Sequence, residues 1–338
     1  MGGKSLENIL IIQTAFLGDV ILATSLVEKI YNHFPDSKID FLLRKGYESL
    51  LEDHPKVNAV YVFDKRNQKL HNLYLLLLKL RSKKYDLVIN IQRFSTTGLI
   101  TVLSRSILRV GFDKNPFSYF FDKKIKHAFD GSHEIERNHK LIERFTDDKP
   151  LKPRLYPTKA NFENVKQYSQ KPYLCIAPAS VWYTKQFPEE RWIEFINQIK
   201  NKGNIYLLGG PGDNDLCERI KNKQIRNAEN LCGKISLLDT AALMQHATLN
   251  LVNDSAPLHI ASAMNAPVAV FYCSTVPSFG YGPLSDDAQI IQVQGSLDCR
   301  PCGHHGMKSC PEDHFDCARK IDFKPIVEDI EERFSKES

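Results

Sequence analysis

The sequence predicts an α/β protein made of two doubly wound parallel-sheet domains. Short apolar runs alternate with longer stretches that carry apolar residues at helical spacing, and this alternation occurs twice along the chain. The 338 residues exceed the usual size of one hydrophobic core, and a polar segment with prolines, 151–171, separates the two halves. Strands that alternate with helices favour parallel sheets with right-handed crossovers. We therefore expect domains over 1–155 and 172–322, joined by a linker and followed by a helix within 323–338.

The predicted strands are short runs of isoleucine, valine, leucine and tyrosine. In the first half they cover 8–13, 38–43, 57–63 and 86–92, and in the second half 173–177, 204–208, 248–252 and 267–272. The longest apolar run, 73–78, is too short to span a bilayer. Because its leucines are nearly continuous, we interpret 70–80 as a crossover helix packed under a sheet; a membrane-docking helix is the alternative.

The first strand leads into a turn that carries a carboxylate. Residues 8–13 are followed by the turn 14–19 and then by a predicted helix over 20–34. Gly18 and Asp19 therefore lie at the carboxyl end of a parallel strand, where open α/β sheets bind their ligands. Asp19 is a candidate functional residue, and the alternative is that it only caps the helix. The turn lacks the G-x-G-x-x-G pattern, so a dinucleotide fingerprint is not supported.

A second strand–turn–helix segment, 251–263, has the pattern of an anion site. An apolar run stops at a polar turn, and a helix of small residues begins at once. Asp254 or Ser255 can act as N-cap, and Pro257 fits the first turn, where its missing N–H costs nothing. The N–H groups and the positive end of such a helix can hold a phosphate or pyrophosphate. A capped crossover helix without a ligand would have the same pattern.

Together these segments resemble glycosyltransferase family 9, the ADP-heptose:lipopolysaccharide heptosyltransferases. The resemblance rests on four motifs in the family's order: Leu17-Gly18-Asp19-Val20, the segment 178–188 with Lys185, Gly209-Gly210-Pro211-Gly212-Asp213, and Asn253-Asp254-Ser255 with His259. Ala179, Phe187 and Ala256 depart from the family pattern. The resemblance implies the GT-B architecture, in which two Rossmann-like parallel-sheet domains face each other across a cleft. It also implies that the last helix crosses back to the first domain.

The resemblance implies an inverting glycosyltransferase that moves a heptose from an ADP-sugar to a lipopolysaccharide core acceptor. In this interpretation Asp19 is the general base, and Lys185 meets the charge of the departing diphosphate. The residues expected to bind the donor are Gly18, Thr184, Asp213, Asp254, Ser255, Ala256 and His259. Lys185 could instead be a surface lysine, Asp213 could only cap the next helix, and His259 could pack in the core. No metal or other cofactor is expected in catalysis.

The excess of positive over negative charge lies in the first half of the chain. Residues 1–150 hold 24 Lys and Arg against 18 Asp and Glu, and no acidic residue occurs between 65 and 84. We expect Arg44, Arg93 and Arg137 to bind the acceptor, a lipid A–core or similar glycolipid; the alternative is that each forms an ordinary surface ion pair. A basic surface also suits an anionic inner-membrane leaflet, whereas no nucleic-acid-binding motif accompanies it. The start of the chain lacks the zones of a signal peptide, so we expect a cytoplasmic protein at the inner face of the membrane.

Four cysteines cluster near the C-terminus. Cys299, Cys302, Cys310 and Cys317 fall within 19 residues. In a reducing compartment such spacing points to metal or redox chemistry before disulfides, and a structural zinc site is one candidate. Reduced cysteines packed in a loop are the alternative, followed by disulfides. The remaining cysteines have the pattern of small core residues; they are Cys175, Cys217, Cys232 and Cys273.

Two other functions remain open at this level. The protein could be another nucleotide-sugar enzyme of the same architecture with a different donor or glycan acceptor, which predicts a preference for a uridine nucleotide. It could also be a non-catalytic binding protein, which predicts that its function does not depend on Asp19.

Overall fold

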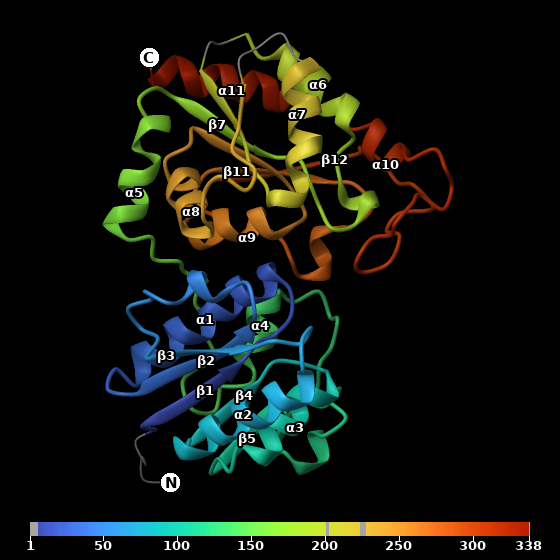
Figure 1. Cartoon of the computed structure of the whole chain (residues 1–338). Helices are drawn as coiled ribbons and strands as arrows, with labels where there is room; N and C mark the ends of the chain where they lie inside the picture. The colour runs from blue at the N-terminus through green and yellow to red at the C-terminus, as the bar shows by residue number, and fades with distance from the viewer. Residues whose placement is uncertain (1–5, 201–202, 224–227, 338) are drawn as a thin grey trace. The chain divides into compact units, whose positions relative to one another are not determined.

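A computed structural model describes residues 6–200, 203–223 and 228–337. The chain forms two compact units, Met1–Tyr156 and Pro157–Ser338, and each is built on a six-stranded sheet (Figure 1). The boundary falls inside the predicted linker. Part of that linker is ordered structure of the second unit, because helix α5 (Lys159–Val165) packs against helix α8 (Leu237–Gln245).

The first unit is an α/β fold with helices on both faces of its sheet. Its strands are β1 (Asn8–Ile12), β2 (Lys38–Arg44), β3 (Ala59–Phe63), β4 (Leu87–Asn90), β5 (Leu108–Phe112) and β6 (Lys123–Ile125). Its helices are α1 (Leu17–His33), α2 (Lys69–Ser82), α3 (Ser95–Leu103) and α4 (Glu134–His139). Helices α1 and α4 pack together, and α2 packs beside α3 (Figure 1).

The second unit repeats this plan. Its strands are β7 (Tyr173–Ala177), β8 (Asn204–Leu207), β9 (Ala228–Asn230), β10 (Leu249–Asn253), β11 (Val268–Tyr272) and β12 (Ala288–Gln292). Besides α5 and α8, its helices are α6 (Glu189–Gln198), α7 (Asn214–Lys223), α9 (Ala256–Ala263), α10 (Asp316–Arg319) and α11 (Lys324–Glu337). Two short 3₁₀ turns, Tyr183–Lys185 and Pro211–Asp213, follow the ends of β7 and β8.

Both sheets are parallel and have the same connectivity. The strand order is β3-β2-β1-β4-β5-β6 in the first and β12-β11-β10-β7-β8-β9 in the second. In each sheet the chain runs outward in one direction from a central strand and then in the other. The reversals lie between β1 and β4 and between β7 and β10. At such switch points the loops beyond the strand carboxyl ends diverge and leave room for a ligand.

All eight predicted strands are present, and four others were missed. Three of the missed strands, β6, β9 and β12, form sheet edges, where one side needs no partner and no continuous apolar run is required. The fourth, β5, contains Arg109 and Gly111. A Cβ atom at Gly111 would come within 2.6 Å of the Phe121 ring, so this glycine permits a close approach rather than ending the strand.

The last helix packs in the second unit, although the family resemblance led us to expect it to cross back to the first. Ile326, Ile330 and Phe334 of α11 are buried in the core of that unit. The guanidinium of Arg333 binds Asp287 and Asp329 of the same unit. None of the described helices is both long enough and apolar enough to cross a membrane.

Candidate functional site

Asp19 lies at the switch point of the first sheet. Helix α1 begins at Leu17, three residues earlier than predicted, so Gly18 and Asp19 belong to its first turn. The backbone N–H of Phe16 donates to Asp19 Oδ2 at 3.2 Å, and the side chain is half-buried. Asp19 therefore caps the helix, as the simpler interpretation predicts.

Two cations that follow or end strands β3 and β2 contact the Asp19 turn. Lys65, just after β3, donates from Nζ to the carbonyl of Thr14 at 2.9 Å. The guanidinium of Arg44, at the end of β2, lies 6.0 Å from the Phe16 ring centre. Loss of hydration lowers the pKa of Lys65, and the charges of Arg44 and Lys69 lower it further. Arg44 thus contacts the turn that carries the predicted base. We did not predict Lys65 as a site residue, although the basic run starting directly after β3 was a usable signal.

The other two predicted acceptor arginines differ in exposure. Arg93, after β4, is exposed and lies over the Phe94 ring. Arg137 is 2% exposed, and its Nε donates to Glu134 Oε2 at 2.9 Å while its guanidinium also reaches the Ser132 carbonyl. Its expected role in acceptor binding therefore does not fit the structure, because the guanidinium is enclosed in a buried ion pair.

Asn253 holds the switch point of the second sheet together. It ends β10 and is fully buried. Its amide nitrogen donates to the carbonyl of Pro178 at 2.8 Å, and its Oδ1 accepts the N–H of Phe187 at 2.9 Å. The loop between Pro178 and Phe187 carries Lys185, so Asn253 fixes both ends of this loop.

Lys185 and Asp254 form an ion pair at this switch point. Lys185 Nζ lies 2.8 Å from Asp254 Oδ2, and the two side chains are 15% and 7% exposed. The same oxygen accepts a 2.7 Å hydrogen bond from Thr275, at the end of β11. Residues that follow β7, β10 and β11 therefore form one network at the carboxyl end of the sheet, and this network holds the Lys185 ammonium in place. Thr275 was not predicted, and no local pattern marks it.

Thr184 is buried and makes structural hydrogen bonds, so its side chain is not exposed to a nucleotide-sugar donor. It is 1% exposed, and its hydroxyl accepts the N–H of Met307 at 2.8 Å and the Ser274 hydroxyl at 2.9 Å. Its own N–H donates to the carbonyl of Met307. The predicted contact of its hydroxyl with the donor is thus replaced by a contact with the cysteine-rich loop, residues 299–317, which ties that loop to the Lys185 turn.

Helix α9 starts next to the Lys185–Asp254 pair. Ser255 is its N-cap residue, and its hydroxyl makes no capping hydrogen bond to the first turn. Ala256 is the first helical residue and is half-buried. His259 is 5% exposed and contacts the Tyr281 ring edge-on, at 6.4 Å between ring centres. The start of α9 and the ammonium of Lys185 together offer positive charge and N–H donors, the chemistry that binds a diphosphate.

Asp213 has a clear capping role. The N–H of Gly210 donates to its Oδ2 at 2.8 Å, which closes the turn after β8. A Cβ atom at Gly209 would come within 2.8 Å of the Asp213 Cβ, so the turn requires glycine there. The carboxylate is half-buried at the carboxyl edge of the same sheet. Its predicted contact with a donor ribose stays a prediction.

An arginine that we did not predict, Arg300, holds the cysteine-rich loop. Arg300 donates to the carbonyls of Cys273 and Thr275, at 2.7 and 2.8 Å, and so caps the end of β11. Burial, and then the neighbouring thiols, raise the pKa of Cys317 to about 12. Among the described residues no group of three or more metal-binding side chains is arranged to hold an ion. The four other cysteines are buried, as expected of core residues.

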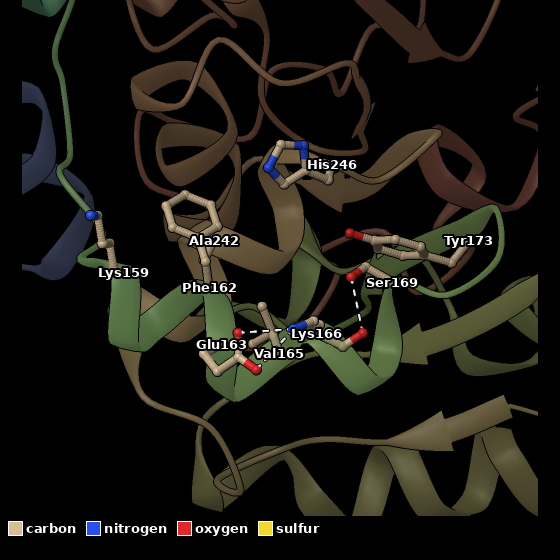
Figure 2. Close-up of a pocket in the computed structure, with 9 residues that line it drawn as sticks. All are labelled: Lys159, Phe162, Glu163, Val165, Lys166, Ser169, Tyr173, Ala242 and His246. Carbon is tan, nitrogen blue, oxygen red and sulfur yellow. Dashed lines mark hydrogen bonds and ion pairs between the residues drawn. The ribbon is translucent and has the colours of Figure 1, made fainter.

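A pocket elsewhere in the second unit is unrelated to these residues. It has a volume of about 460 Å³ and lies between α5 and α8 (Figure 2). Phe162, Lys166 and His246 line it, together with Tyr173, the first residue of β7. It is therefore at the amino end of the sheet, the opposite end from Asn253 and Lys185.

Comparison with known proteins agrees with the geometry. The model of the family described as glycosyltransferase family 9 (heptosyltransferase) matches residues 74–312. Lipopolysaccharide heptosyltransferase 3 of Escherichia coli is 27% identical, over 77% of this chain and 82% of the relative. Lipooligosaccharide heptosyltransferase 2 of Haemophilus influenzae is 25% identical, over 86% of this chain and 90% of the relative.

Solved structures show the same fold. A family 9 glycosyl transferase from Veillonella parvula superposes with a TM-score of 0.86 at 20% identity and covers 98% of both chains. The E. coli ADP-heptose lipopolysaccharide heptosyltransferase II superposes with a TM-score of 0.77 at 21% identity, covering 98% of this chain and 99% of that one. The two-unit α/β architecture is therefore that of the GT-B heptosyltransferases. With more than half of its length matched by the family model, the chain belongs to glycosyltransferase family 9, the heptosyltransferase family.

Proposed function

We propose that this protein transfers a heptose from an ADP-sugar to a lipopolysaccharide core acceptor, with inversion at the anomeric carbon. Membership of the heptosyltransferase family supports the reaction class. The observation that carries the proposal is the Lys185–Asp254 ion pair beside the start of α9, at the switch point of the second sheet. These groups can bind a nucleoside diphosphate. Relatives of this chain are named as heptosyltransferases, which fits a nucleotide-sugar donor.

The proposed reaction is a single displacement. An acceptor hydroxyl attacks the anomeric carbon, its proton passes to Asp19, and the bond from that carbon to the diphosphate oxygen breaks. ADP leaves with the electron pair of that bond, and attack from the opposite side inverts the configuration. Lys185 and the N–H groups at the start of α9 offset the negative charge that grows on the diphosphate. Since these groups supply positive charge, we propose that catalysis requires no metal.

The acceptor is proposed to bind along the Asp19 edge of the first sheet. Arg44 and Lys65 both contact residues of the Asp19 turn, and Arg93 is exposed at the end of β4, beside β1. Guanidinium and ammonium groups suit the phosphates and carboxylates of a lipid A–core acceptor. We propose that the protein acts in the cytoplasm, at the inner face of the membrane that holds such an acceptor.

Sugar transfer by the Asp19→Asn variant tests the base. Asparagine keeps the oxygen that accepts the Phe16 N–H, so the helix cap is preserved while the proton acceptor is lost. We expect transfer from ADP-heptose to a lipid A–core acceptor to fall by a factor of about 10² to 10⁴. Binding of ADP, measured by calorimetry, should remain unchanged. Asp36→Asn, an exposed aspartate in the turn after α1, is the matched control.

The outcomes separate the three candidate functions. Transfer that survives in Asp19→Asn would contradict the base assignment. Tight ADP binding without transfer by the wild type would point to another sugar or acceptor, and a preference for UDP would favour a different nucleotide-sugar enzyme. Failure to bind either nucleotide would favour a non-catalytic binding protein. Metal analysis of the purified protein tests the cysteine cluster independently, since a bound structural zinc would be found at one ion per chain.

A further inference from the structure

Helix α2 has a buried apolar face and an exposed one. Leu73, Leu76 and Leu80 are at most 8% exposed and pack in the core of the first unit. On the outer side Leu70, Tyr74 and Leu78 are 79%, 60% and 49% exposed. These three positions are four residues apart and therefore form one continuous stripe along the helix. Our interpretation of 70–80 as a purely core helix was thus only half right.

The exposed stripe belongs to a segment rich in positive charge. Besides Lys65, which binds the Thr14 carbonyl, the segment carries six further lysines and arginines: Arg66, Lys69, Lys79, Arg81, Lys83 and Lys84. No acidic residue occurs between 65 and 84 in the sequence. Within the described ranges no ion pair joins any of the six to a carboxylate. Their charge is therefore available to a partner that approaches the outer face of α2.

Neighbouring segments extend the apolar surface. Helix α3 packs beside α2 (Figure 1). Its last residue, Leu103, is 38% exposed. Ile107 is 57% exposed and donates its N–H to the carbonyl of Tyr85, which places it beside the segment that follows α2. Of the sixteen large apolar side chains that are exposed in the described structure, twelve belong to the first unit. Single exposed apolar residues are ordinary, whereas a stripe with neighbours marks an interaction surface.

We propose that the outer face of α2 docks on an anionic phospholipid bilayer. Leucine and tyrosine side chains enter the headgroup region, while lysines and arginines around them contact lipid phosphates. A second copy of the chain fits this face poorly, because a two-fold contact would bring two basic clusters together. Helix α2 starts six residues after β3, at the carboxyl end of the parallel strands, where the Asp19 turn also lies. Docking along α2 would bring the first unit to a membrane that holds a glycolipid acceptor, a benefit that rests on the proposed function, although docking itself does not.

Vesicle binding by the full chain tests the proposal. We would measure co-sedimentation with vesicles of phosphatidylcholine alone and with vesicles containing one quarter phosphatidylglycerol. The wild type is expected to bind the anionic vesicles, and binding should weaken as salt is raised. The triple variant Leu70→Ser, Tyr74→Ser, Leu78→Ser should bind about tenfold more weakly. Since all three side chains are exposed, its thermal melting should match the wild type.

Matched controls separate the surface from general hydrophobicity. Ile290→Ser removes an apolar side chain that is 45% exposed on β12 of the second unit, and it should leave vesicle binding unchanged. The charge variant Lys79→Gln, Arg81→Gln, Lys83→Gln should abolish the preference for anionic lipid.

Failure of the wild type to bind anionic vesicles would overturn the proposal, as would equal binding by the triple variant. A wild-type dimer in ultracentrifugation that the triple variant dissociates would assign the surface to a second copy instead. Activity on a soluble acceptor fragment should be the same in all of them, so a failed docking test does not affect the proposed reaction.

Discussion

The backbone of Gly306 lies directly against the aliphatic stem of Lys185. A Cβ atom at position 306 would come within 2.8 Å of Lys185 Cγ, and the glycine has a φ of +77°. The next residue, Met307, exchanges hydrogen bonds with Thr184. Lys185 is therefore held by the cysteine-rich loop along its stem and by Asp254 at its ammonium.

Replacing Gly306 with alanine should displace Lys185. The added methyl group meets the lysine stem, so we expect weaker ADP binding and a transfer rate reduced by about tenfold or more. Gly303→Ala is the matched control: its φ is +80°, but no atom lies within 4 Å of the added Cβ. Both variants should lose about 1–2 kcal/mol of stability from the left-handed backbone, as measured by denaturant unfolding. Equal activity of the two variants would show that the loop does not position Lys185.

Replacing Asp254 with asparagine should impair the same lysine by another route. The shape of the side chain and an acceptor for Thr275 are retained, but the charge that orients the ammonium is lost. We expect the transfer rate to fall by about tenfold to a hundredfold, measured with saturating acceptor. Thr275→Val removes the other partner of the same oxygen and leaves the ion pair, so its effect should be smaller. If the valine variant were the more damaged, the hydroxyl rather than the charge would be the organising group.

The two arginines Arg93 and Arg137 should give opposite results. Arg137→Ala removes a guanidinium from a buried ion pair and should cost about 3–5 kcal/mol of unfolding free energy. Its KM for the acceptor, in the molecules that remain folded, should be unchanged. Arg93→Ala removes an exposed side chain and should raise the acceptor KM several-fold at constant melting temperature. A raised acceptor KM for Arg137→Ala without loss of stability would restore our original assignment of that residue.

The first unit should lose stability in mild acid because of His54. Burial, opposed by the charge of Glu28, lowers the pKa of this histidine from 6.5 to about 4. Between these values the unfolded chain takes up a proton that the folded chain does not. The free energy of unfolding should therefore fall as the pH drops from 6.5 towards 4, by up to about 3 kcal/mol.

The His54→Gln variant tests this slope. Denaturant unfolding at several pH values should show a shallower decline than in the wild type. Some slope should remain, because burial also lowers the pKa of His127 to about 4. His71→Gln, at an exposed position on α2, is the control and should follow the wild type. A slope that survives undiminished in His54→Gln would show that His54 is not its source.

The sequence by itself determined the elements whose signals are local. Central parallel strands are buried on both faces and need continuous apolar runs, so β1 and β10 were predictable within a residue or two. The turns after these strands were predictable for the same reason, and they carry Asp19 and Asp254. Edge strands such as β9, with the sequence Ala-Glu-Asn, give no such run and were missed.

Only the tertiary structure decided which side chains meet. Arg93 and Arg137 have the same chemistry in the sequence, but packing against Glu134 buries one of them and leaves the other exposed. The contact between Gly306 and Lys185 joins residues far apart in the chain, and no local pattern encodes it. On α2 the leucines are so nearly continuous that their spacing defines no single face. Which leucines face the core and which face outward depends on the sheet beneath them, which the helix sequence alone does not specify.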